Sequence, residues 1–320
     1  MQGQKSERNK TIDISLEDGK EYLDRCLDFS ACINKNLSLD EIKNQIIVGN
    51  SLEVSKAVPA ACADLIIADP PYNIQKEFHG YTFHQMDYDS YESYTEEWVS
   101  AVSHILKPEG SFYVCCDWKS SGAIERVLSK HFVVQNRITW QREKGRGAKK
   151  NWKNGMEDIW FCTQKEDNYT FNIEDVMQRR KVIAPYKQEG KPKDWEETEE
   201  GNFRNTYPSN FWDDISIPYW SMSENTAHPT QKSEKLLAKL ILASSNKGDL
   251  VFDPFSGSGS TAVTAFKLDR NFFAIEMNPQ YCVWAQKRLE DAIKDKTIQG
   301  YADGVFWERN TNSFQRAFKR

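Results

Sequence analysis

The stretch "DLVFDPFSGSGSTAVTAFKL", residues 249–268, decides how this chain folds. Its apolar start predicts a buried strand ending at Asp253, and its second half predicts the helix that follows. Between them, Gly257 and Gly259 stand where the backbone can approach a ligand closely and where a helix amino terminus offers free N–H groups. Glycines after a strand are also common as plain turns. Taken alone, the stretch therefore fits either a ligand-binding turn or a simple one.

The next strand favours the interpretation of this stretch as a ligand-binding turn. "NFFAIE" ends at Glu276, 23 positions after Asp253 (276 − 253). A carboxylate at about this separation reaches ribose hydroxyls in dinucleotide-binding folds. Ala262 occupies the place of the third glycine of GxGxxG, so the ligand need not be a dinucleotide. A shorter nucleoside ligand fits equally well.

Strands and helices alternate on both sides of this unit, which predicts an α/β domain with a mostly parallel sheet. A helix is expected over "YTEEWVSAVSHILK", ended by the Pro and Gly signals of "KPEG" at 107–110. Residues 1–40 form a polar extension without a clear strand. We expect residues 41–165 and 225–320 to be two halves of one domain. The expected strands before the glycine turn are "QIIVG", "DLIIAD", "SFYVCCD", "VVQNRITW" and "DIWFCTQ".

Residues 166–224 break this rhythm, being rich in charge, Trp, Tyr and Pro. We interpret them as an irregular insert whose aromatic residues pack on or bind something.

Composition narrows the class of protein. The chain has 320 residues, 39% of them hydrophobic, which favours a folded protein. It has no run of eighteen apolar residues and no apolar leader, so we expect neither a membrane span nor a secretory signal. Seven cysteines without paired spacing favour reduced thiols in a cytoplasm and predict no metal site. The net charge of −5 disfavours a protein that coats nucleic acid, although a local basic surface remains compatible with it.

A second short stretch carries chemistry. In "DLIIADPPYN", residues 64–73, a buried strand delivers Asp69, two prolines and Tyr72 to one place. Pro71 has a fixed φ and restricts Pro70 to extended geometry, which holds the Pro70 carbonyl in position. Without other motifs, Asp69 would equally well cap a turn and Tyr72 fill an apolar gap.

Three motifs together resemble a known family. "DPPYNI" at 69–74, "HPTQK" at 228–232 and "DPFSGSGST" at 253–261 are similar to motifs of the DNA amino-methyltransferases, in the order of the beta group. Those enzymes transfer a methyl group from S-adenosyl-L-methionine to an exocyclic amine of adenine or cytosine. The resemblance covers about residues 45–295. It implies a Rossmann-like methyltransferase fold, with a twisted sheet flanked by helices, and a target-recognition role for the insert.

The resemblance also implies site residues. The catalytic motif would be Asp69, Pro70, Pro71 and Tyr72. The cofactor would be held by Asn50, Asp69, His228, Thr230, Gln231, Lys232, Asp253, Pro254, Phe255, Gly257, Gly259, Ser260, Glu276 and Met277. Asn50 is a departure, because many relatives have an aspartate there that binds the adenine amine of the cofactor. Its side-chain oxygen can accept the same bond.

The residue types suit this chemistry. An exocyclic amine is a weak nucleophile because its lone pair spreads into the ring, and two acceptors aimed at its hydrogens localise that pair. Asp69 and the Pro70 carbonyl would be those acceptors. The base must be flipped out of the duplex, and Tyr72 would stack on it. No proline is followed by cysteine, which disfavours carbon-5 methylation of cytosine. The reaction requires no metal.

Double-stranded DNA needs basic contacts, and "REKGRGAKKNWK" at 142–153 supplies them. Such stretches are often only solvated faces. Two glycines favour a flexible loop that touches phosphates, with Trp152 either a wedge or a buried residue. The candidate DNA contacts are Arg142, Lys144, Arg146, Lys149, Lys150, Trp152 and Lys153.

Several alternatives stay open. Adenine N6 is favoured over cytosine N4, because enzymes of the second kind more often begin the tetrapeptide with serine. Methylases of RNA or protein amides commonly begin it with asparagine and lack a long insert. A catalytically dead DNA-binding regulator is disfavoured by the intact motifs. A cognate restriction endonuclease and a homodimer are further partners that the resemblance suggests.

Overall fold

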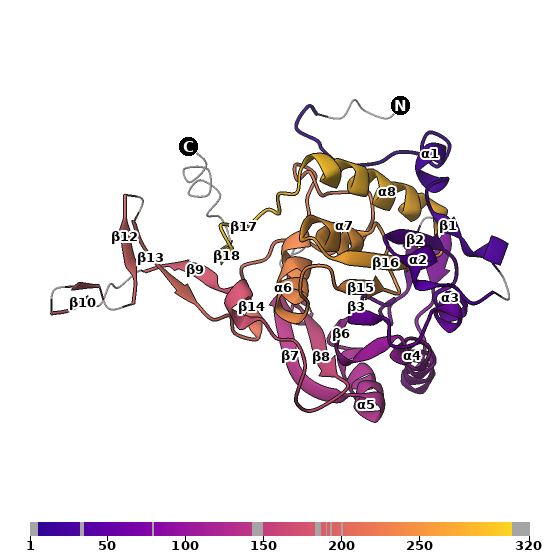
Figure 1. The fold of residues 1–320 in the computed structure, drawn as a ribbon, viewed down its shortest axis with the longest axis horizontal. Helices are drawn as coiled ribbons and strands as arrows, with labels where there is room; N and C mark the ends of the chain where they lie inside the picture. Colours follow the sequence, from indigo (N-terminus) through magenta and orange to yellow (C-terminus); the bar gives the residue numbers. More distant parts are fainter. Residues whose placement is uncertain are drawn as a thin grey trace.

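The computed structural model describes residues 6–32, 35–78, 80–142, 150–182, 187–189, 191–192, 194–199 and 201–308. Within these ranges, one nine-stranded sheet crosses the molecule (Figure 1). Every neighbouring pair is parallel except that β8 runs antiparallel to both β6 and β7. The strand order is β1 (Leu27–Asp28), β2 (Gln45–Val48), β16 (Asn271–Glu276), β15 (Leu250–Asp253), β3 (Ala63–Ala68), β6 (Leu106–Cys116), β8 (Met156–Thr163), β7 (Val133–Gln141) and β14 (Phe211–Trp212). The expected α/β fold with a mostly parallel sheet is confirmed.

Helices cover both faces of this sheet. One layer contains α3 (Ser51–Ala57), α4 (Tyr88–Ser103) and α5 (Ser121–His131); the other contains α6 (Glu234–Ser244), α7 (Ser260–Lys267) and α8 (Pro279–Lys294). Side chains alternate along each strand. In β3, Ile66 therefore packs in the cluster of the first layer, whereas Leu65 and Ile67 pack in that of the second. This double burial explains why β3 reads as a continuous apolar run.

The helix expected to run through Lys107 ends earlier. It stops at Ser103, and Leu106 already pairs with Ala63 in the sheet. Pro108 and Gly110 consequently lie inside β6 and do not terminate a helix. Sheet pairing with β3, a long-range contact, has overridden the local helical pattern.

The amino-terminal extension is part of the fold. It contains α1 (Lys20–Leu23), the edge strand β1, the short helices η1 (Phe29–Cys32) and α2 (Leu39–Ile42), and a bridge between Ile12 and Thr226. The carbonyl of Ile14 also accepts hydrogen bonds from the side chains of Gln280 and Trp284 in α8. No strand was predicted here because β1 has only two residues, too few to form a recognisable pattern.

The insert builds a second sheet that projects from the main body (Figure 1). Its order is β12 (Glu196–Thr198), β13 (Gly201–Thr206), β9 (Gln178–Lys181), β18 (Val305–Trp307) and β17 (Tyr301–Ala302), with a hairpin of β10 (Lys187–Gln188) and β11 (Lys191–Pro192) beyond it. The helix η2 (Ile173–Val176) precedes it. Two strands from the carboxy-terminal part of the chain thus complete this sheet, and Trp212 of the insert belongs instead to the main sheet. The expected boundaries 166–224 therefore do not coincide with the projecting unit.

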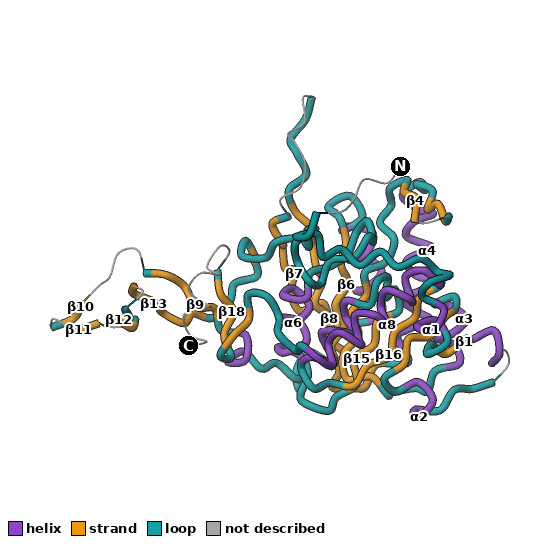
Figure 2. Tube along the Cα trace, turned by 90° about the horizontal axis from the view of Figure 1, so that it is seen from above, coloured by secondary structure: helices purple, strands orange, loops and turns teal. Residues whose placement is uncertain are grey.

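The carboxyl ends of β3, β15 and β16 bring distant residues together. The chain leaves β15 through α7 on one face and leaves β3 through α4 on the other. Neighbouring strands whose connections diverge leave a crevice at their carboxyl ends, where ligands of such folds bind. A hairpin of β4 (Lys76–Phe78) and β5 (Tyr81–Phe83) lies next to this edge, towards the top of Figure 2. None of the described helices combines the length and apolar character that crossing a membrane requires.

Candidate active site

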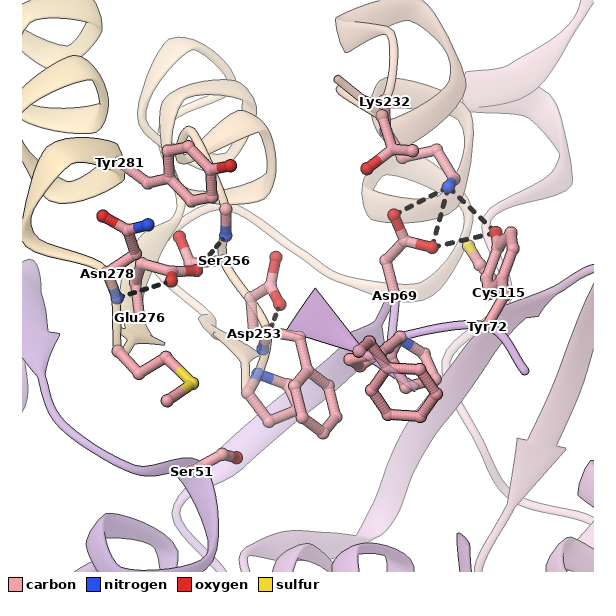
Figure 3. Close-up of a pocket in the computed structure, with 18 of the residues that line it drawn as sticks. Ser51, Asp69, Tyr72, Cys115, Lys232, Asp253, Ser256, Glu276, Asn278 and Tyr281 are labelled. Carbon is pink, nitrogen blue, oxygen red and sulfur yellow. Dashed lines mark hydrogen bonds and ion pairs between the residues drawn. The ribbon is translucent and has the colours of Figure 1, made fainter. Parts of the chain in front are cut away.

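One cavity of about 560 Å³ opens at this crevice. It has the size of a small-molecule site. Asp69 and Tyr72 line it together with Asp253 and Glu276, so two motifs that are far apart in the sequence meet in one space. Figure 3 shows Asp253 between the two ends of the cavity, with Lys232, Asp69 and Tyr72 at one end and Glu276, Asn278 and Tyr281 at the other.

The glycine turn has the geometry that only glycine adopts easily. Gly257 and Gly259 have φ of 52° and 76°. The N–H of Gly257 donates to Glu276 Oε2 at 2.7 Å, and the N–H of Asn278 donates to Glu276 Oε1 at 2.8 Å. Glu276 therefore joins the ends of two strands besides lining the cavity. Gly259 does not line it; a Cβ there would meet Ala285 of α8 at 2.5 Å.

Two carboxyl groups that line the cavity are unusually easy to protonate. Burial raises the pKa of Asp253 to about 7, although hydrogen bonds from Thr261 and from the backbone of Phe255 oppose the shift. Burial likewise raises the pKa of Glu276 to about 7, against its backbone hydrogen bonds. A cation bound between them would favour their ionised forms.

Two candidates from "HPTQK" that line the cavity differ in what they contact. The His228 ring lies edge-on to Tyr281, 4.4 Å between centroids, and a Cβ on Gly257 would lie 3.1 Å from its Nε2. Gln231 lines the cavity but also binds its own loop, because its amide donates to the Glu224 carbonyl at 2.6 Å. His228 is therefore packed against the glycine turn, whereas Gln231 holds the loop that carries it.

The remaining cofactor candidates surround the same space. The Asn50 oxygen caps α3 by accepting from the N–H of Leu52, which leaves its second lone pair for a ligand. The other candidates that line the cavity are Thr230, Pro254, Phe255, Ser260 and Met277.

Lys232 lies beside Asp69, at the opposite end of the cavity from Glu276 (Figure 3). Its ammonium is 2.7 Å from each carboxylate oxygen of Asp69 and 3.0 Å from the hydroxyl of Tyr72 (Figure 3). Burial by itself lowers the pKa of Lys232, but the carboxylates of Asp69 and Glu157 outweigh burial and raise it above its ordinary range. Lys232 is therefore cationic and partners Asp69 and Tyr72, a place that its position in "HPTQK" did not indicate.

Arg142 also differs from the expectation. Its guanidinium faces into the cavity and forms an ion pair with the buried carboxylate of Glu157, with only 24% of its side chain exposed. We therefore separate it from the expected phosphate contacts. Lys150, Trp152 and Lys153 are exposed, Trp152 to 95%, so Trp152 is not a core residue. Lys144, Arg146 and Lys149 lie outside the described residues.

Glu157 and Cys115 line the cavity, but no role was predicted for either of them from the sequence. For Glu157, an acidic residue inside the apolar strand β8 is a usable signal. Cys115 also lines the cavity, and burial raises the pKa of its thiol well above the ordinary value. It therefore stays a thiol, which does not suit a covalent nucleophile.

If these two carboxyl groups hold the cofactor that the sequence motifs imply, its binding should depend on pH. Because their pKa values are raised to about 7, Asp253 and Glu276 are mostly protonated a unit below that value and mostly ionised a unit above it. S-adenosyl-L-methionine carries a positive charge at sulfur, which ionised carboxylates attract. We therefore expect its Kd to fall as the pH rises through this range. Calorimetric titration at several pH values measures this.

Glu276→Gln is the control for that titration, and it should weaken binding on the alkaline side while flattening the pH dependence. A Kd of the wild type that is equal on both sides of the folded pKa values would contradict the assignment of these carboxyl groups to the cofactor.

The same two groups also affect the stability of the cofactor-free protein. Their folded pKa values lie above those of an unfolded chain, so they reduce its stability progressively as the pH rises from about 4 to about 7.

Comparison with known proteins agrees with this geometry. A family model for N6/N4 methyltransferases, described as "DNA methylase", matches residues 63–287. The chain is 35% identical over 254 residues to the DNA adenine methyltransferase YhdJ of Escherichia coli (strain K12), covering 77% of this chain and 83% of the relative. It is 31% identical over 248 residues to the type II methyltransferase M.HpaI of Haemophilus parainfluenzae, covering 77% and 74%.

Solved structures show the same fold. The complex of M1.HpyAVI with S-adenosylmethionine (SAM) is 25% identical, with a TM-score of 0.54 over 77% of this chain and 98% of that one. The cytosine-N4-specific PvuII DNA methyltransferase is 20% identical, with a TM-score of 0.59 over 79% and 90%. The cavity, with its glycine turn and acidic lining, fits a cationic nucleoside cofactor. This chain belongs to the N6/N4 DNA methyltransferase family, whose cofactor is S-adenosyl-L-methionine and whose substrate is DNA.

Proposed function

We propose that this protein is a site-specific DNA methyltransferase that modifies the N6 amine of adenine in a short duplex sequence. The observation that carries the proposal is the shared cavity, in which Asp69 and Tyr72 face the same space as the glycine turn. The adenine-specific relative and the aspartate that opens "DPPY" favour adenine. Cytosine N4 is the second candidate, because the fold is shared with a cytosine-specific enzyme.

In this proposal Asp69 and the carbonyl of Pro70 accept hydrogen bonds from the amine of the flipped base. The Pro71 carbonyl is already engaged, since Tyr91 donates its hydroxyl to it at 3.0 Å. That bond holds the two prolines in place. The side chain of Asn73 holds the next segment through reciprocal bonds with the backbone of Met86, at 2.7 and 2.9 Å. The backbone that carries the Pro70 carbonyl is therefore held in place before the base arrives, which favours the transition state.

S-adenosyl-L-methionine, when bound, supplies an electrophilic methyl group. We assign the ring of Tyr72 to stacking on the base, a contact worth about 1–3 kcal/mol. Such stacking offsets the few kcal/mol that flipping costs. We assign the methionine part of the cofactor to Asp253 and Phe255, the ribose to Glu276, and neighbouring contacts to Asn50, His228, Thr230, Gln231 and Met277.

The decisive experiment is the identity of the product. DNA methylated by the purified protein would be digested to nucleosides and analysed by mass, and we expect the deoxynucleoside of N6-methyladenine. N4-methylcytosine alone would refute the adenine assignment. Sequencing with modified-base detection of DNA from cells that express the protein would give the recognition sequence and show whether methylation is site-specific.

We assign the contact with DNA phosphates to the loop between β7 and β8. In Figure 2 the described part of this loop rises from the side of the molecule that carries the β4–β5 hairpin. Trp152 in its exposed part is suited to stacking on bases. The projecting sheet of β9, β12 and β13 is our candidate for target recognition. A homodimer and a cognate restriction endonuclease are further proposals, the second suggested by the type II relatives.

Changing Lys150 and Lys153 together to alanine should weaken DNA binding and reduce its salt dependence. Each lost phosphate contact lowers the slope of log K against log salt by about 0.9. Binding measured by fluorescence anisotropy between about 50 and 200 mM salt tests this, because affinities change steeply over that range.

The matched control is Lys247→Ala, a lysine that pairs with Asp269 on the surface between α6 and β15. It should leave the slope unchanged. A slope equal to that of the wild type in the double variant would mean that the loop does not touch phosphates.

A further inference from the structure

Glu157 enters the cavity from β8, behind the catalytic motif. Its side chain is only 3% exposed. Its Oε2 lies 3.1 Å from the hydroxyl of Tyr72 and 3.3 Å from the ammonium of Lys232. Its Oε1 accepts a hydrogen bond from the guanidinium of Arg142, which follows β7. Three elements of the cavity thus meet at this one carboxylate.

The four charged groups form an alternating chain: Asp69, Lys232, Glu157 and Arg142. Two negative and two positive charges balance, so each of them has an opposite neighbour. Removing one partner from a buried ion pair is strongly destabilising, because it leaves the other charge uncompensated. The orientation of any one member therefore depends on the next.

Tyr72 and Lys232 each depend on Glu157 for direction. The Tyr72 hydroxyl lies between two carboxylates, 2.9 Å from Asp69 Oδ1 and 3.1 Å from Glu157 Oε2, and burial with these charges raises its pKa, so it keeps its proton. An anchored hydroxyl fixes the direction in which the ring points across the cavity. Lys232 has three N–H bonds to direct, and Glu157 is a second carboxylate within its reach besides Asp69.

We propose that Glu157 is a positioning residue for methyl transfer, which orients the ring of Tyr72 and the ammonium of Lys232, and through Lys232 the carboxylate of Asp69. The proposal rests on the function proposed above for this cavity. When a base occupies the site, one oxygen of Asp69 must turn to the amine and the ammonium must give up one of its bonds. Glu157 is the acceptor within reach for the bond that Lys232 gives up.

The test uses Glu157→Gln in the full-length protein, because the amide has the same shape but no charge. We expect single-turnover methyl transfer to slow by about 10²-fold, the cost of a small misplacement of reacting groups. The Kd for S-adenosyl-L-methionine should stay within about twofold of the wild type, since Glu276 and Asn278 lie at the other end of the cavity (Figure 3). A duplex with 2-aminopurine at the target base should show altered fluorescence, because the stacking ring has lost its anchor.

Asp158→Asn provides the matched control. Asp158 is the next residue in β8 and is equally buried, because only 2% of either residue is exposed. It contacts Thr139 and Arg137, on the other face of the sheet. A purely structural loss should appear in this variant as a lower Tm, with the transfer rate per folded molecule preserved. Glu157→Asp, which keeps the charge, should recover part of the rate.

Two results would overturn the proposal. One is a transfer rate in Glu157→Gln within about twofold of the wild type, a small difference on the free-energy scale of catalysis. The other is a loss of rate that is fully accounted for by a smaller fraction of folded protein, as expected for Asp158→Asn. If the wild type methylates cytosine, the adenine assignment fails, but the ratio of variant to wild type on that base still tests Glu157. If the wild type methylates neither base, both proposals fail.

Discussion

Replacing Asp69 by alanine is expected to lower the rate of methyl transfer by at least about 10²–10³-fold, the loss typical when one preorganised hydrogen-bonding group is removed from an active site. In the function proposed above, Asp69 is the carboxylate that accepts a hydrogen bond from the amine of the base. Of the two carboxylates in the alternating chain of charges, Asp69 is the more exposed, with 23% of its side chain exposed against 3% for Glu157. Lys232 would also keep Glu157 and the Tyr72 hydroxyl as partners at 3.3 and 3.0 Å, so the cavity should remain folded. Single-turnover transfer of labelled methyl groups to duplex DNA measures the effect.

Cofactor affinity separates this effect from a collapsed site. The Kd for S-adenosyl-L-methionine should change little in Asp69→Ala, because the carboxyl groups assigned to the cofactor, Asp253 and Glu276, are untouched. Asp69→Asn is the closer variant: its amide keeps one acceptor oxygen but presents N–H groups to Lys232, so we expect an intermediate or equally large loss. Turnover at the wild-type rate in either variant would contradict the role given to Asp69.

Replacing Gly259 by alanine should destabilise the whole domain more than any surface change. The residue has φ of 76°, a left-handed conformation that costs a residue with a Cβ about 1–2 kcal/mol. The new Cβ would also lie 2.5 Å from the Cβ and 3.0 Å from the Cα of Ala285, and overpacking of this kind costs about 1–3 kcal/mol. Since the backbone of α8 cannot turn aside as a flexible side chain would, α7 and α8 must separate.

Gly248→Ala isolates the first of these costs. Gly248 has φ of 86° but no atom within 4 Å of a built Cβ, so its variant carries the backbone strain alone. Thermal unfolding followed by circular dichroism should show a larger fall in Tm for Gly259→Ala than for Gly248→Ala, with about 2–4 °C for each kcal/mol in a domain of this size. Equal Tm values would mean that the contact between α7 and α8 adjusts without cost.

The part of the fold around the glycine turn could be predicted from the sequence because the residues that identify it are close together in the chain. A strand, a glycine turn and a helix follow one another within residues 249–268, and Glu276 ends the very next strand. Gly257 and Gly259 have positive φ. This is a local property of the backbone, and a glycine in the sequence indicates directly where it can occur. The family and the cofactor expected from the three motifs are confirmed by comparison, and the mostly parallel sheet by the structure.

Other features depend on partners far along the chain. Local periodicity predicted a helix through Lys107, but pairing with β3 ended it at Ser103. The strands β17 and β18 are too short to be recognised in the sequence; β18 forms because it pairs with the edge of β9, and β17 forms because it pairs with β18. A strand of two or three residues has no pattern of its own, so only its neighbour identifies it.

The sequence alone determined the order of strands and helices around the glycine turn, the turns that need glycine, and the chemical groups at the strand ends, because each of these is set by neighbours within a few residues. Only the tertiary structure decided which groups face one another. Arg142 turned inward to Glu157, and Lys232 reached Asp69 across 163 positions of sequence. A buried charged group pairs with whichever oppositely charged group the fold brings close to it, and separation along the sequence does not indicate which group that is.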